Sequence, residues 1–74
     1  MQGTDHIIRA TLRALLAYRG ISIPDFAEQI GISRTALYNR MAGDTPWSAE
    51  EVARIAVALD IPVATFYGGL QVAS

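Results

Sequence analysis

The sequence contains no cysteine and only one histidine, His6, among its 74 residues. Without a thiol the chain has no disulfide, no thiolate metal ligand and no cysteine nucleophile. The acidic residues are scattered and form no ligand cluster with His6. We therefore expect a fold that is held by apolar packing alone, with no cofactor and no metal. Its length is near the lower limit for a core without cross-links.

Long apolar runs and the features of a signal peptide are absent too. No apolar stretch is long enough to span a bilayer, and the N-terminal MQGTDHII lacks the basic-then-apolar order of a signal peptide. We therefore expect a cytoplasmic protein without a membrane-spanning segment. The composition, 51% hydrophobic and 18% charged, is that of a globular chain rather than a disordered tail.

Lysine is also missing, so all six basic residues are arginines. The net charge of −1 lacks the basic surplus that is usual in nucleic-acid-binding proteins. The charge is uneven, however: residues 1–43 hold five arginines and three acidic residues, whereas residues 44–74 hold one arginine and four acidic residues. Such a dipolar domain could still present a positive face to DNA, and arginine is a good fork-shaped donor to phosphate and guanine.

What the sequence does contain is helical periodicity. Apolar residues recur three and four positions apart, and neither the alternation of strands nor hairpin turns are visible. We predict an all-α fold, a compact five-helix bundle that forms a single domain over residues 1–74. The expected helices cover about residues 5–19, 23–30, 33–42, 49–59 and a short stretch from about residue 63, with a flexible tail at 68–74.

Capping residues indicate where these helices begin. Thr4 is the expected N-cap of the first helix, and Ser33 that of the third. Ser48 opens SAEE, a capping box in which the side chain of Glu51 reaches back to the start of the helix. Ser22 opens SIPD, a variant of the same box.

The stretch FAEQIGISRTALYNRMAG, residues 26–43, holds two helical patterns that are hinged at Gly31. Leu37 and Met41 lie four positions apart and therefore on one face of the second helix. At about 100° per residue, four polar residues share the side away from them. These residues are Arg34, Thr35, Tyr38 and Asn39.

This stretch resembles the helix-turn-helix of the lambda-repressor-like, or Cro/C1-type, DNA-binding domains of phage repressors and bacterial regulators. In that family a small residue, here Ala27, lies four positions before the turn glycine, here Gly31, and a second glycine, here Gly43, often follows the recognition helix. EEVARIAVALDIPVATFY also resembles the fourth and fifth helices of the family. The resemblance covers about residues 12–67 and implies a five-helix fold that reads duplex DNA with its third helix.

The resemblance implies base contacts three, four and eight positions after the turn glycine, which here are Arg34, Thr35 and Asn39. Arginine can donate a fork to guanine, asparagine can pair with adenine, and threonine can touch a thymine methyl group. The same polar pattern would also suit a solvated helix of any small bundle. The expected phosphate or supporting contacts are Ser22, Ser33, Tyr38, Arg40 and Thr45.

Three positions depart from the pattern of the family. Ile23 stands at the start of the second helix, where many members have a glutamine that contacts phosphate. Arg40 stands nine positions after the turn glycine, where many members bury an apolar residue, and we expect Met41 to take that inner role. Asp60 ends the fourth helix where glycine is common, and aspartate tolerates the left-handed conformation better than most residues.

Three further residues allow two interpretations. Trp47 could anchor a partner, although a lid over the core is the more usual role of such a residue. Arg9 and Arg13 lie one turn apart on the first helix, where they suit a solvated face and a phosphate-binding face equally well.

We expect a sequence-specific transcriptional regulator that binds double-stranded operator DNA, resembles a phage Cro or repressor, and is not an enzyme. No small-molecule ligand is expected.

Since one small module binds DNA weakly, we expect a homodimer. One alternative is an antitoxin or an excision-type accessory DNA-binding protein, and another is a protein-interaction adaptor on the same fold. The expected dimer residues are Val63, Tyr67, Leu70 and Val72.

Overall fold

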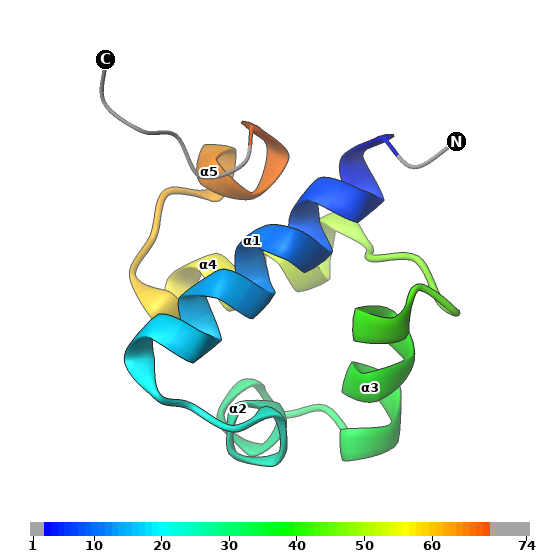
Figure 1. Ribbon diagram of the computed structural model, residues 1–74, viewed down its shortest axis with the longest axis vertical. Coiled ribbons are helices and arrows are strands. Elements are labelled where there is room, and N and C mark those ends of the chain that lie inside the picture. Colours follow the sequence, from blue (N-terminus) through cyan, green and yellow to red (C-terminus); the bar gives the residue numbers. More distant parts are fainter. Residues whose placement is uncertain (1–2, 69–74) are drawn as a thin grey trace.

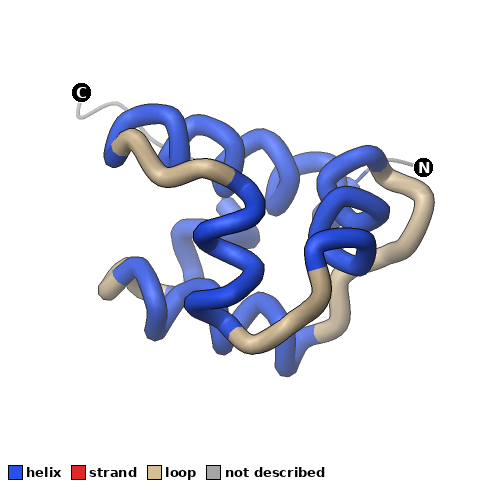
Figure 2. Tube along the Cα trace, turned by 90° about the horizontal axis from the view of Figure 1, so that it is seen from below, coloured by secondary structure: helices blue, strands red, loops and turns tan. Residues whose placement is uncertain are grey.

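The computed structural model describes residues 3–68, which form five helices and contain no strand (Figure 1). Only short loops join the helices (Figure 2). The predicted all-α, five-helix fold is therefore confirmed, with element bounds close to those expected. The helices are α1 (Gly3–Arg19), α2 (Ile23–Ile30), α3 (Arg34–Ala42), α4 (Ala49–Leu59) and α5 (Val63–Gly68).

The start of α1 differs from the prediction. The helix begins at Gly3, so Thr4 lies inside its first turn and is not the N-cap. A threonine costs little in a first turn, and helix ends are the least well determined part of a sequence pattern. Asp5 does lie in the first turn, where a negative charge is favourable.

The other three predicted N-caps are confirmed. The hydroxyl oxygens of Ser22, Ser33 and Ser48 each accept a hydrogen bond from the backbone N–H three residues later, at 3.2, 3.0 and 3.1 Å. Each bond satisfies a backbone donor that has no partner within its helix. The starts of α2, α3 and α4 are thus set by local chemistry.

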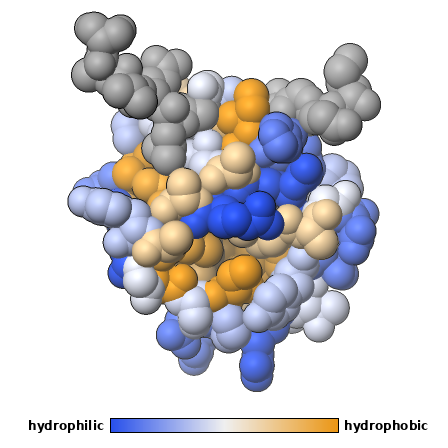
Figure 3. All heavy atoms as spheres, viewed as in Figure 1, coloured by the Kyte–Doolittle hydropathy of each residue, from blue (hydrophilic) through white to orange (hydrophobic). Residues whose placement is uncertain are grey.

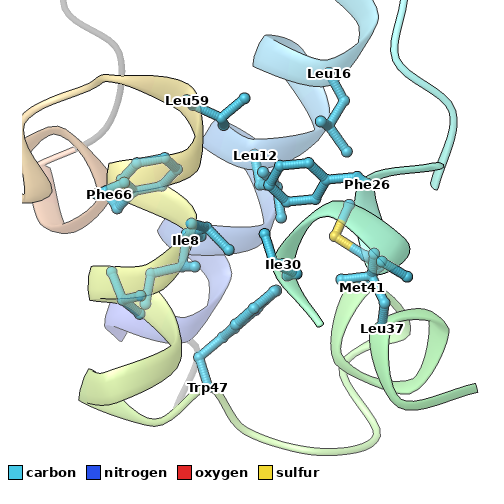
Figure 4. Packing of buried hydrophobic residues seen from close by; sticks show 14 residues of the cluster. Ile8, Leu12, Leu16, Phe26, Ile30, Leu37, Met41, Trp47, Leu59 and Phe66 are labelled. Carbon is cyan, nitrogen blue, oxygen red and sulfur yellow. The ribbon is translucent and has the colours of Figure 1, made fainter. Parts of the chain in front are cut away.

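The inner faces of all five helices meet in one apolar core (Figure 4). Trp47, which precedes α4, closes the core from the loop between α3 and α4 and is buried, as the core interpretation predicted. Met41 is buried in the core, as predicted, whereas the neighbouring Arg40 is only partly buried. The largest fully buried side chains are Phe26, Phe66, Leu12, Leu37, Ile55, Leu59 and Val52.

Candidate nucleic-acid interface

The turn between α2 and α3 sets the direction of α3. Gly31 ends α2 with φ at 78°, in the left-handed region that glycine adopts without steric cost. The backbone N–H groups of Gly31 and Ile32 donate to the carbonyl oxygen of Ala27 at 2.9 and 3.0 Å. These bonds close the end of α2, and Ser33 then caps α3 only two residues after the turn glycine.

The exposed side of α3 carries the polar residues that the sequence predicted there. Leu37 and Met41 are buried on the side of the helix away from Thr35 and Asn39, and Arg34, three positions before Leu37, is exposed in the first turn. We call the exposed set the recognition face. Within residues 3–68 none of its side chains is engaged in a hydrogen bond or an ion pair, so its donors and acceptors are available to a ligand. The recognition face consists of Arg34, Thr35, Tyr38 and Asn39.

An open groove separates the N-terminal parts of α2 and α3. Two exposed carboxylates, Asp25 and Glu28, border it on α2, and Arg34 borders it on α3. The charge beside the recognition face is therefore mixed rather than uniformly positive, in keeping with the low net charge of the chain. Pro24, Ala27 and Ile32 complete the lining of the groove.

The serine and threonine candidates for phosphate contact lie around α3. Ser22 and Ser33 are exposed at the N-terminal ends of α2 and α3, where their oxygens accept cap bonds and their O–H groups can still donate. Thr45 is partly buried in the loop after α3, and its backbone N–H lies 3.4 Å from the carbonyl oxygen of Asn39. The structure thus places all three near an end of α2 or α3.

Arg40, a predicted phosphate contact, differs from the recognition face because its guanidinium has partners within the protein. Its Nη2 lies 2.6 Å from Oε2 of Glu51, and its Nη1 donates to the carbonyl oxygen of Ala36 at 3.1 Å. The Arg40 side chain is 19% exposed and that of Glu51 is 17% exposed. The guanidinium therefore has a partner on α4 within the protein, which no local pattern predicted.

Glu51 serves two helices with one carboxylate. Its Oε1 accepts the backbone N–H of Ser48 at 3.0 Å and completes the predicted capping box of α4. Burial raises the pKa of Glu51, but the hydrogen bond and charge of Arg40 and the bond from the Ser48 backbone lower it more, so the pKa lies below its ordinary value of 4.5. The carboxylate is thus held in its charged form.

Of two arginines on α1, Arg13 contacts the end of α3, and Arg9 pairs with a carboxylate of its own helix. Arg13 donates to the carbonyl oxygen of Met41 at 3.2 Å. Arg9 pairs with Asp5 at 2.9 Å, and the other carboxylate oxygen of Asp5 accepts the backbone N–H of Trp47, also at 2.9 Å. Both arginines therefore have partners inside the protein, an arrangement that neither of the two sequence-based interpretations included.

A second open groove lies between α4 and the start of α5. Val57 is 81% exposed beside it, and Val63 is 44% exposed. Tyr67, on α5, is 41% exposed. Val57 was not among the predicted dimer residues, although its position off the inner stripe of α4 could have indicated it. The other two predicted dimer residues, Leu70 and Val72, lie outside the described residues.

The face that carries α1 is mixed in character, with hydrophobic side chains lying among hydrophilic ones (Figure 3). Tyr18 near the end of α1 is 89% exposed. Within residues 3–68, no helix is long and apolar enough to cross a membrane, and no group of three or more potential metal ligands comes together.

Comparisons with known proteins agree with this geometry. The model of the Cro/C1-type HTH DNA-binding domain matches residues 11–68, from the middle of α1 to the end of α5. The crystal structure of the clp gene regulator ClgR from C. glutamicum is similar, with a TM-score of 0.78 and 26% identity over 89% of this chain and 86% of that chain. No curated protein sequence matches the chain. The protein is therefore a DNA-binding transcription regulator that belongs to the Cro/C1-type helix-turn-helix family.

Proposed function

We propose that the protein binds a specific operator by placing α3 in the major groove of duplex DNA. The observation that carries this proposal is the recognition face, a set of polar side chains that have no partner within residues 3–68 on a helix whose other side is anchored in the core. The major groove admits one α-helix and presents a distinct pattern of donors and acceptors at each base pair. A small rigid helix with free polar groups suits that surface.

Three residues of the recognition face are proposed to read bases. Arg34 lies in the first turn of α3 and can donate two hydrogen bonds to guanine. Asn39 can exchange two bonds with adenine, and Thr35 can contact a thymine methyl group or donate a bond from its hydroxyl. Their positions along α3 would allow them to contact neighbouring base pairs of one half-site.

The proposed phosphate contacts lie beside these residues. Ser22 and Ser33 stand at helix N-termini, where backbone N–H groups and the helix dipole favour an anion. Tyr38 and Thr45 could each donate a hydroxyl bond. Such contacts fix the register of the protein on DNA and carry little sequence information.

We further propose that the regulator acts as a Cro-like or repressor-like protein in a bacterial cell, on cytoplasmic DNA. Bound at its operator it would block or assist RNA polymerase. A homodimer would place two α3 helices about one turn of DNA apart, roughly 34–36 Å. The exposure of Val63 and Tyr67 supports an interface at α5. The proposed interface also includes Leu70 and Val72, which lie outside the described residues.

An antitoxin or an excision-type accessory protein would use the same contacts in another circuit, so the two differ from a repressor only in the genes they control. A protein-interaction adaptor is a separate candidate, because the net charge of −1 is low for a DNA-binding protein. The adaptor would use α3 against protein and would show no salt-dependent affinity for duplex DNA.

The test is a selection of bound sequences from random duplex DNA, followed by affinity measurements at several salt concentrations. We expect one enriched motif, and a logarithm of the affinity that falls linearly with the logarithm of the salt concentration. A two-fold symmetric motif would indicate binding as a dimer. The absence of any enriched motif, or of binding at low salt, would contradict the proposal and favour the adaptor.

A further inference from the structure

The contact between Arg40 on α3 and Glu51 on α4 is unusual within this structure. Among residues 3–68 it is the one ion pair that joins two different helices, since Asp5–Arg9 lies within α1 and Glu50–Arg54 within α4. At 2.6 Å it is also the shortest of the three, and both of its side chains are mostly buried. A contact of this kind restricts how the two helices can move relative to each other.

The buried contacts of α3 lie along one line of the helix. Only Leu37 and Met41 of this nine-residue helix are buried, and they lie four positions apart on one line along the helix. Apolar contacts along one line restrict the rotation of a helix about its axis less than contacts on several sides do. Arg40 lies beside the line, three positions after Leu37, so a bond from its guanidinium to α4 opposes that rotation.

The position of Arg40 also argues against a direct contact with DNA. Its Nε is buried without a partner within residues 3–68, and its Nη1 is engaged with the carbonyl oxygen of Ala36. To reach a phosphate, the guanidinium would have to leave Glu51. That carboxylate, already bound to the start of α4, would then remain partly buried without its counter-charge, which is unfavourable.

We propose that Arg40 and Glu51 are positioning residues, which hold α3 at the rotation about its axis that turns Arg34, Thr35 and Asn39 toward the bases. This inference rests on the proposed function, since it concerns how the recognition face meets DNA. Neither residue touches DNA, and their effect on affinity is exerted through α3. The capping box makes Glu51 a fixed point, because its other oxygen is bound to the backbone of Ser48.

The test is a double-mutant cycle of Arg40→Met and Glu51→Gln. Glutamine retains an oxygen that can complete a capping box, and methionine retains much of the apolar stem of arginine. Binding is measured for the duplex selected by the wild-type protein and for a random duplex, at a temperature where Trp47 fluorescence shows each variant to be folded. Glu50→Gln is the matched control, because it removes the same charge from the adjacent, exposed residue of α4.

Each single variant is expected to lower the ratio of selected-site to random-site affinity by about three- to tenfold, in the range of couplings between contacting residues. The double variant should be little worse than either single variant, and the slope of affinity against salt should not change. Arg40→Lys retains a cation opposite Glu51, so its affinity ratio should lie between those of Arg40→Met and the wild type. Glu50→Gln should leave the ratio as it is.

A direct phosphate contact by Arg40 would give a different result. Arg40→Met would then reduce the salt slope by about 0.9, the value for one lost phosphate contact, and Glu51→Gln would release the arginine and strengthen binding beyond the effect of Glu50→Gln. That result overturns the inference while DNA binding stands, as does an unchanged affinity ratio in all variants. If the wild-type protein selects no sequence at all, the proposed function fails and the inference fails with it.

Discussion

At the scale of single residues, the polar side chains of α3 divide into two groups with different surroundings. Arg34 and Asn39 are exposed and have side chains without partners within residues 3–68, whereas Arg40 is mostly buried and bound to Glu51. A free side chain can exchange its bonds with water for bonds with a base, but a paired one must first give up its partner. The surroundings of each residue, more than its type, therefore decide its expected role.

Arg34→Ala and Asn39→Ala should each relax the preference for one base pair of the selected site. The expected loss of discrimination is about 1–3 kcal/mol at that position, because alanine cannot form the bidentate contact. Affinities for sites with single base changes measure this loss. Arg54→Ala is the control, since Arg54 is an exposed arginine of α4 outside the recognition face. An equal weakening for all sites would mean that the two residues contact phosphate instead of bases.

The lowered pKa of Glu51 predicts how its ion pair responds to acid. Since its folded-state pKa lies below the ordinary value of 4.5, the pair stabilises the fold fully above that pH. This contribution is lost as the pH falls through the lower, folded-state pKa. The difference in free energy of unfolding between the wild type and Glu51→Gln should therefore shrink from about pH 6 to about pH 3.

Urea denaturation followed by the fluorescence of Trp47, the single tryptophan, measures this difference at each pH. Glu50→Gln serves as the comparison, because the Glu50 side chain is 84% exposed and its pair with Arg54 is 3.5 Å long. A difference between the wild type and Glu51→Gln that stays constant over this range would show that the carboxylate of Glu51 does not account for it.

At the scale of the elements, the ends of the helices follow a common pattern with one exception. Gly31 and Gly43 follow α2 and α3, as predicted, and both adopt the left-handed conformation. Asp60 ends α4 in the same conformation, with φ at 57° and ψ at 46°. Because a Cβ atom makes this conformation unfavourable, α4 carries a small strain that the other two ends avoid.

Asp60→Gly should stabilise the fold by up to about 1 kcal/mol, because glycine adopts the left-handed conformation without steric cost. For a domain of this size, that corresponds to an increase of roughly 4–8 °C in the melting temperature. Asp60→Ala, which removes the same carboxylate but retains a Cβ atom, should not raise it. Thermal unfolding of both variants tests the explanation, which would be wrong if alanine and glycine had the same effect.

At the scale of the whole molecule, the two halves of the sequence differ in net charge, and we expect them to have different functions. The half of the sequence with an arginine surplus contains the recognition face, and the acidic half contains α4 and α5. The exposed apolar residues Val57 and Val63 border a groove on the acidic half. This separation suits a module that binds DNA with one part and a second copy with another.

A Val57→Asp/Val63→Asp double variant should therefore weaken self-association, since it places like charges on both partners of a symmetric interface. Sedimentation of the free protein over a range of concentrations measures the effect. The control is Tyr18→Asp, because Tyr18 is an exposed apolar residue on another helix, α1, where it is 89% exposed. A wild-type protein that stays monomeric at every concentration and on its selected DNA would exclude the dimer.

Much of the fold and the recognition face could be predicted from the sequence, because the signals that specify them are local. The spacing of Leu37 and Met41 indicates which side of α3 is buried, and hence that Thr35 and Asn39 are exposed. Ser33 and Gly31 mark the start of α3 through bonds that reach no more than a few residues along the chain. The start of α1 was missed by about two residues, since the end of a helix depends on weaker preferences.

The partners of Arg40 and Arg13 were decided by the tertiary structure alone. Arg40 meets Glu51 from another helix, Arg13 reaches the carbonyl oxygen of Met41, and these contacts exist only after the core has set the helices in place. No periodicity encodes such pairs, because the distance between two helices depends on every side chain packed between them. The sequence by itself thus determined the five helices and the residues of the recognition face. Packing in three dimensions decided how α3 is held, and it paired Arg40, a predicted phosphate contact, with Glu51 of α4.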